Sequence, residues 1–337
     1  MGTPASVSSR TSSAREALVD GPARPRILYL GGLGRSGSTL IERLLGEMPG
    51  VCAAGEVVHL WRRSIAEGEL CGCGEPFGSC PFWQLVGKAA FGGWDRVDVH
   101  RVTALRSAVD RTRFVPQLAA PAMRPAFRRA LDEYTSYYLR TYQAIAQASG
   151  CSLVVDSSKH ASLAFCLARC PDIDLRILHV VRDSRAVAYS WTKKVNRPDA
   201  ASVTYMTRYS PATSAAQWNL QNGAMHLLAR TGTPVLRVRY EDAARAPEAT
   251  LRKIAAFAGL PAGGSALAFL GGADGDRWAK LSTAHTASGN PMRFATGRIP
   301  IRQDENWRIA MPAGQRRMVT ALTLPLLSRY GYARPAA

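Results

Sequence analysis

The chain has 337 residues, 47% of them hydrophobic, which is enough to build one large α/β domain or two small ones. Its formal net charge of +18 makes nucleic acid, anionic membranes and anionic small molecules possible partners. The excess is mostly arginine spread along the chain without a basic block, which favours an anionic ligand pocket over a nucleic-acid arm. The sequence has neither an apolar run long enough to span a membrane nor an apolar stretch typical of a secretory signal, so we expect a cytoplasmic protein without stable membrane insertion.

Residues 1–25 are rich in Ser, Ala, Arg and Pro, and we predict that they form a disordered tail. The stretch that follows predicts a buried strand over Ile27–Leu30, a glycine-rich turn that ends at Gly37, and a helix that begins near Thr39. Glycines let the backbone approach an anion closely, and the start of a helix presents free N–H groups to it. This region is therefore predicted to bind a phosphate-like group.

The turn is not that of an ordinary nucleotide hydrolase. Such enzymes place a lysine where Ser38 stands, and the nearest cation here is Arg35. The segment GLGRSGSTLIERLL instead resembles the 5′-phosphosulfate loop of sulfotransferases that use 3′-phosphoadenosine-5′-phosphosulfate (PAPS), in the form typical of the tyrosylprotein, carbohydrate and bacterial branches. The resemblance implies that the phosphosulfate is bound by Arg35, Ser36, Gly37, Ser38 and Thr39.

A second segment, VVRDSRAVAYSW, resembles the 3′-phosphate motif of the same family, in which an Arg closes a strand and a Ser follows eight residues later. Arg182 and Ser190 occupy these positions. Arginine offers a two-pronged donor to phosphate, and a serine two helical turns further on can add a hydroxyl from the same face. Arg185 either neutralises the helix start or reaches the nucleotide.

Two residues are candidates for the chemistry. A short strand that ends at Gly55-Glu56 is predicted to lie beside the first strand and to bring Glu56 near the phosphate loop. In the tyrosylprotein branch of the resembled family, a Gly-Glu at this spacing supplies the general base, which takes the proton of the acceptor hydroxyl. His59 and His160 are alternative bases. The resemblance also implies that Lys159 stabilises negative charge on the leaving oxygen.

Later segments match the family over shorter stretches. Tyr240 stands at a position that is often near the cofactor, although it could equally serve in packing. The polar segment from His285 to Phe294 has no helical or strand period and lies where the family places a loop over the cofactor. Gly289 would allow close approach there, and Arg293 could contact the 3′-phosphate. A plain surface loop is the alternative.

Residues 68–83 contain Cys71, Cys73 and Cys80. Their spacing lacks a clear fourth metal ligand, so zinc, a disulfide and a tight turn packed on Phe82 and Trp83 remain open, with the turn favoured. We expect no metal in the catalytic site. Seven cysteines in a chain without an apparent signal fit a reducing cytoplasm.

Repeated strand–helix units predict an α/β, P-loop-like three-layer fold with a central parallel sheet and helices on both faces. We expect a single domain over residues 26–335. The region 60–150 is predicted to be a mostly helical insertion over the active site that binds the acceptor. The aromatic stripe between Tyr134 and Tyr142 is interpreted as helix core rather than a substrate platform.

The predicted activity is transfer of a sulfuryl group from PAPS to an acceptor hydroxyl by in-line displacement, with 3′-phosphoadenosine 5′-phosphate (PAP) as product and without a metal. The acceptor could be a small molecule such as a secondary metabolite, a carbohydrate, a lipid or a tyrosine, and the oligomeric state is equally open. The residues of the motifs resemble those of bacterial members of the family. A P-loop kinase and a non-catalytic protein that binds anions or nucleic acid are the alternatives.

Overall fold

A five-stranded parallel sheet forms the centre of the computed structural model, which describes residues 24–197, 204–273 and 275–333. The first 23 residues of the predicted tail lie outside the described residues. The sheet has the order β2-β3-β1-β4-β7. Its strands are β1 (Arg26–Gly31), β2 (Val51–Gly55), β3 (Leu153–Lys159), β4 (Asp174–Val181) and β7 (Val235–Arg239).

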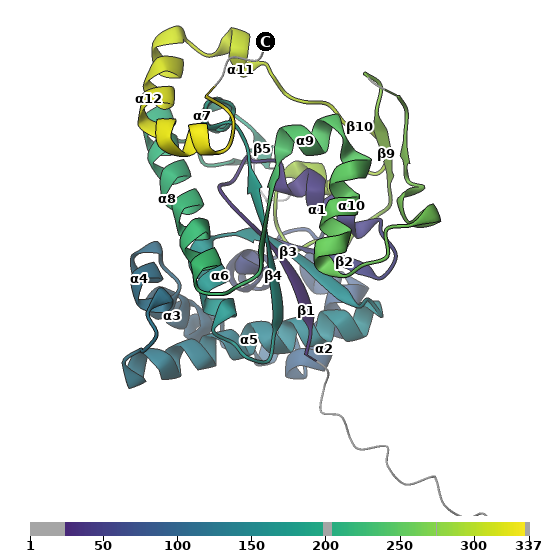
Figure 1. The fold of residues 1–337 in the computed structure, drawn as a ribbon. Helices are drawn as coiled ribbons and strands as arrows, with labels where there is room; N and C mark the ends of the chain where they lie inside the picture. The colour runs from purple at the N-terminus through teal and green to yellow at the C-terminus, as the bar shows by residue number, and fades with distance from the viewer. Residues whose placement is uncertain (1–23, 198–203, 274, 334–337) are drawn as a thin grey trace, which may run out of the picture.

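Helices cover both faces of this sheet, as predicted (Figure 1). The alternation along β1 shows why: Ile27 and Tyr29 pack into one core and Leu28 and Leu30 into the other, and all four are fully buried. The first face is covered by α5 (Pro125–Ser149), α6 (Ala161–Ala168) and α8 (Pro211–Arg230), and the second by α1 (Ser38–Gly46), α9 (Tyr240–Arg245) and α10 (Pro247–Ala258).

One prediction about the sheet is wrong. The strand that ends at Gly55 does not lie beside the first strand, because β3 is inserted between β2 and β1. The parallel partner of Val51 is therefore Leu153. This order brings the carboxyl end of β2 next to the carboxyl end of β3, so Glu56 is delivered beside Lys159.

Two helical stretches are interrupted. The stretch over residues 240–258 is divided into α9 and α10, because Pro247 pushes Ala246 out of the helical region, to φ −137° and ψ 69°. Helix α3 (Val99–Val109) is followed by a single 3₁₀ turn over Thr112–Phe114.

The region 60–150 is mostly helical, as predicted, and also contains α2 (Pro81–Phe91) and α4 (Val115–Ala119). Its long helix α5 packs against α2, α3, β2 and β3. Tyr134, Tyr138 and Tyr142 on α5 are 0% exposed, which confirms that the aromatic stripe is core. The main part of this region therefore supports a sheet face.

The remaining elements belong to the second half of the chain. They are α7 (Ser184–Thr192), β5 (Asn196–Arg197), β6 (Thr204–Tyr205), β8 (Leu270–Gly271), β9 (Trp278–Leu281), β10 (Gly297–Pro300), α11 (Trp307–Ala310) and α12 (Ala313–Arg329). Strands β8, β9 and β10 form a small antiparallel sheet, and α12 packs on α7 and α8 (Figure 1). Within the described ranges, none of the helices is both long and apolar enough to cross a bilayer.

Candidate active site

The turn between β1 and α1 is built to hold an anion. Gly37 has φ 84°, and a Cβ at this position would lie 2.1 Å from the ring of Tyr240, so the backbone conformation and the close packing both require glycine. No side chain caps the start of α1, and its first turn carries no acidic residue. The free N–H groups and the positive end of the helix dipole are therefore available to a ligand.

A cavity of about 710 Å³ opens at this turn and extends along the carboxyl ends of the strands. This volume suits a ligand of nucleotide size. Among the described residues, its walls hold seven cationic side chains and two carboxylates. The cations are Arg35, Arg63, Arg106, Arg111, Lys159, Arg182 and Arg302, and the carboxylates are Glu56 and Asp110. This excess of positive charge favours an anionic ligand.

Most of the site residues predicted from the sequence line this one cavity. They are Arg35, Gly37, Ser38, Thr39, Glu56, Lys159, Arg182, Ser190, Tyr240 and Gly289. Ser36 and Arg293 do not belong to its wall. Ser36 is 2% exposed, and the guanidinium of Arg293 donates hydrogen bonds to the main-chain oxygens of Thr286 (2.9 Å) and Leu70 (2.7 Å). In this structure Arg293 therefore braces the loop from behind the wall.

Arg182 is held firmly at the end of β4. Its Nη1 donates to the main-chain oxygen of Arg35 (3.1 Å), its Nη2 donates to that of Asp304 (3.1 Å), and its guanidinium lies 4.5 Å from the ring centre of Tyr240. The Nε atoms of Arg35 and Arg182 are both buried without a hydrogen-bond partner. These are donors that an anionic ligand in the cavity could satisfy.

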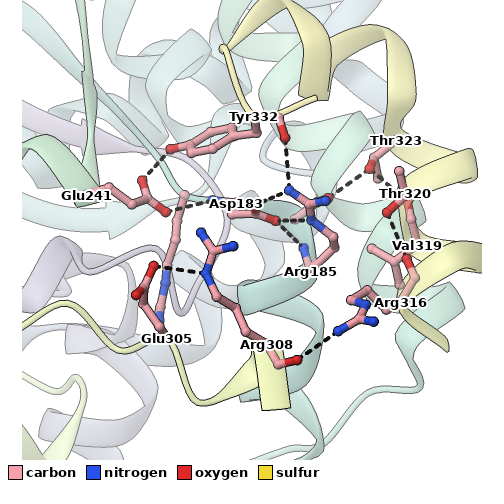
Figure 2. A network of polar contacts seen from close by, with 12 residues as sticks. Asp183, Arg185, Glu241, Glu305, Arg308, Arg316, Val319, Thr320, Thr323 and Tyr332 are labelled. Atoms are coloured by element: carbon pink, nitrogen blue, oxygen red, sulfur yellow. Dashed lines mark hydrogen bonds and ion pairs between the residues drawn. The ribbon is translucent and has the colours of Figure 1, made fainter. Parts of the chain in front are cut away.

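The turn after Arg182 is braced by the C-terminal part of the chain (Figure 2). Arg185 donates to both carboxylate oxygens of Asp183 (2.9 and 2.6 Å) and to the main-chain oxygen of Tyr332 (2.9 Å). Glu241 accepts from the main-chain N–H of Asp183 (3.1 Å) and from the hydroxyl of Tyr332. Of the two roles considered for Arg185, the structure supports the one at the helix start.

The candidate base and the candidate cation form an ion pair. Lys159 Nζ lies 2.6 Å from Glu56 Oε1 and also donates to the main-chain oxygen of Ser157 (2.9 Å). Lys159 adopts a left-handed conformation with φ 71°, which is uncommon for a residue other than glycine and is concentrated at functional sites. Its main-chain oxygen accepts from the N–H of Gly32 (3.2 Å), which couples the end of β3 to the phosphate loop.

Comparison with known proteins identifies the family. A model described as "Sulfotransferase family" matches residues 81–263, which is more than half of the chain and includes Lys159, Arg182, Ser190 and Tyr240. The chain belongs to the sulfotransferase family. Carbohydrate sulfotransferase 3 of Mus musculus is 28% identical over 181 residues, and the protein of the same name from Homo sapiens is 29% identical over 188 residues. These matches cover 50% and 51% of this chain and only 36% of each relative.

Solved structures also resemble this chain. The sulfotransferase domain from the olefin synthase of Synechococcus PCC 7002 has a TM-score of 0.47 and 20% identity, and the alignment covers 94% of this chain and 98% of that one. The sulfotransferase STF9 from Mycobacterium avium has a TM-score of 0.43 and 15% identity, with 92% and 78% covered.

The charge states around Glu56 follow from burial and neighbours. Burial alone would raise the pKa of Glu56, but the Lys159 ammonium and a contact with His59 (3.5 Å) outweigh it, so the pKa lies well below its usual value. Burial lowers the pKa of His59, and it lowers the pKa of His160 to about 3. At neutral pH the Glu56 carboxylate therefore contacts the Lys159 ammonium on one side and the neutral imidazole of His59 on the other.

Several arginines that line the cavity were not predicted as site residues from the sequence. Arg106 and Arg111 come from the end of α3 and the turn after it, Arg63 from a π-helical segment over Leu60–Ala66, and Arg302 from the chain after β10. None of these arginines belongs to a motif, and each looks like one of many scattered basic residues. Their contribution depends on tertiary contacts between segments far apart in the chain.

Proposed function

We propose that this protein transfers a sulfuryl group from PAPS to an acceptor hydroxyl. The observation that carries the proposal is one cavity in which the phosphate loop, Arg182 and the Glu56–Lys159 pair meet. The family membership supports sulfotransfer, and the excess of cations in the cavity supports a donor with several negative charges.

Two groups of residues would hold the donor. The loop residues Arg35, Ser38 and Thr39, together with the open start of α1, are suited to the 5′-phosphosulfate. Arg182 and Ser190 are suited to the 3′-phosphate, with the buried Nε of Arg182 still lacking a partner. When bound, PAPS would supply a sulfuryl group attached to a phosphate leaving group.

Glu56 and Lys159 would then do the chemistry. The Glu56 carboxylate takes the proton of the acceptor hydroxyl while the hydroxyl oxygen bonds to sulfur. As the bond between sulfur and the phosphate oxygen breaks, negative charge develops on that oxygen, and the Lys159 ammonium stabilises it. The charge balance is met because the proton ends on Glu56 and the negative charge leaves with PAP. His59, 3.5 Å from Glu56, lies in position to relay this proton.

The acceptor side of the cavity is polar and basic. Arg63 and Arg106 line the cavity together with Glu56 and His59. Such polar walls suit an acceptor with several hydroxyl groups. Carbohydrates are the first class to test, because the curated relatives are named carbohydrate sulfotransferases.

A transfer assay tests the proposal. Radiolabelled PAPS is incubated with the protein and a panel of neutral and acidic saccharides and small hydroxyl compounds, and PAP release is measured in parallel. We expect labelled product and an equal amount of PAP, with Glu56→Gln as the inactive control. Transfer of phosphate from ATP with Mg²⁺ and none of sulfate from PAPS would overturn the proposal.

A further inference from the structure

Four metal-binding side chains meet outside the cavity. Cys71, Cys73 and Cys80 come from the turn before α2, and His285 comes from the loop after β9. Their ligand atoms all lie within 4.8 Å of one another, and none of the four lines the candidate active site. The spacing of the cysteines does not reveal the fourth ligand, because His285 is 205 residues from Cys80 in the sequence.

We propose that this cluster is a structural zinc site with three cysteine ligands and one histidine ligand. A tetrahedral zinc ion with bonds of about 2.3 Å to sulfur and about 2.0 Å to nitrogen would separate its ligand atoms by roughly 3.5–3.8 Å. The Sγ atoms of Cys73 and Cys80 are 3.8 Å apart. His285 Nδ1 lies 3.2 Å from Cys80 Sγ and 3.8 Å from Cys71 Sγ. The spacing therefore fits a shared central ion.

The surroundings hold the ligands in place. Cys80 is the N-cap of α2, where the helix dipole favours negative charge. The ring of Phe82 stacks on His285 at 5.2 Å between ring centres and fixes the orientation of the imidazole. Three cysteines around one point, all unpaired, fit a metal better than a single disulfide.

The site would fasten two segments that are distant in sequence. The N–H of Gly72 donates to the main-chain oxygen of Thr286 (3.0 Å), and a Cβ on Gly72 would lie 2.3 Å from the Thr286 hydroxyl, so the turn and the loop already touch closely. The next residue, Ala287, exchanges hydrogen bonds with Ala54 and Glu56 (2.8 Å each). A metal at His285 would therefore stabilise the loop that borders the candidate base.

The chemistry of the ligand set assigns the role. Four protein ligands complete the tetrahedral shell of zinc and leave no open position for a substrate, as in structural rather than catalytic sites. Zinc would not take part in sulfuryl transfer. The inference is independent of the proposed function, because a structural metal can be present whatever the cavity binds.

Metal analysis of the untagged full-length protein, purified under reducing conditions, tests the proposal. We expect about one zinc per chain in the wild type and in the control Cys151→Ser, whose thiol lies outside the cluster. Cys73→Ser should lose stoichiometric zinc. His285→Ala should bind zinc more than about 100-fold more weakly, since losing a ligand costs more than losing an outer partner.

A second measurement covers the case in which the variants do not fold. Chelation should lower the melting temperature of the wild type, and added Zn²⁺ should restore it. Replacement by Co²⁺ should give thiolate-to-cobalt charge transfer and the visible bands of tetrahedral cobalt. The proposal is overturned if the reduced wild type binds neither ion stoichiometrically, if Cys73→Ser keeps all its zinc, or if two of the three cysteines are found in a disulfide.

Discussion

Lys159 Nζ and Glu56 Oε1 lie 2.6 Å apart at the carboxyl ends of two neighbouring strands, inside a cavity dominated by positive charge. The Lys159 ammonium outweighs the effect of burial on the pKa of Glu56, so the pair keeps the carboxylate ionised. A bound donor with negative charge would compete with Glu56 for the Lys159 ammonium. Release of this contact would raise the pKa of Glu56 and make it a stronger base at the moment it is needed.

Replacement of the candidate base should separate catalysis from binding. Glu56→Gln keeps the size of the side chain but removes its ability to accept a proton, so we expect turnover to fall by about 10²–10⁴-fold. PAP binding should change little. Turnover and PAP affinity measured on the same preparation check this, and full activity would remove Glu56 from the role and direct attention to His59 and His160.

Replacement of the candidate cation should move the pH profile. Lys159 is a main cause of the low pKa of Glu56, so Lys159→Met should raise that pKa. The remaining activity of the variant should therefore begin to fall at a higher pH than that of the wild type as the solution is acidified. The pH dependence of kcat/KM checks this, and an unshifted acid limb would show that Glu56 is not the titrating base.

Loss of the proposed contact between Arg182 and the 3′-phosphate should weaken the binding of PAP more than the binding of 5′-AMP. Arg182→Ala removes a charged two-pronged donor, worth about 1.5–3 kcal/mol, so PAP should bind roughly 10–100-fold more weakly. Binding of 5′-AMP, which lacks the 3′-phosphate, serves as the internal control and should change far less. Equal losses for both nucleotides would indicate that Arg182 only maintains the cavity through Arg35 and Asp304.

A buried carboxyl in α1 should make stability depend on pH. Burial raises the pKa of Glu42 to about 7, against 4.5 for the free side chain, although Gly55 and Ser157 donate hydrogen bonds to it. Between these pH values the folded chain binds more protons than the unfolded chain, so the free energy of unfolding falls as pH rises from 4.5 to 7. This contribution is on the order of 3 kcal/mol.

Denaturant unfolding at pH 5 and pH 7.5 checks this effect. Glu42→Gln has no proton to exchange, so its free energy of unfolding should fall less over this interval than that of the wild type. The exposed Glu248 of α10, changed to Gln, is the matched control and should leave the wild-type slope in place. Identical slopes for the wild type and Glu42→Gln would contradict the assignment.

The sequence predicted the parts of the fold that local patterns encode. The apolar run before Gly31, the helix after Gly37 and the alternating strand–helix units all have local signatures, and the parallel sheet is confirmed. The predicted position of β2 beside β1 was wrong, because strand order depends on packing between distant segments. The limits of the single domain over residues 26–335 stay a prediction.

In the candidate site, too, the sequence predicted the residues that belong to local motifs and missed those that do not. Arg35, Lys159 and Arg182 were predicted because they stand at fixed places in motifs, and the structure brings them to one cavity. Arg106 and Arg302 were missed because no local pattern marks them. The sequence does not predict His285 as a metal ligand, because no local pattern links it to three cysteines more than 200 residues away.

Calorimetric titration with PAP, compared with 5′-AMP and with ATP plus Mg²⁺, tests the central claim most directly. We expect PAP to bind far more tightly than 5′-AMP, because the 3′-phosphate adds charge-assisted hydrogen bonds from Arg182. We also expect Mg²⁺ to be unnecessary for PAP binding. Absence of PAP binding, or a preference for ATP with Mg²⁺, would contradict the sulfotransferase account and favour a kinase.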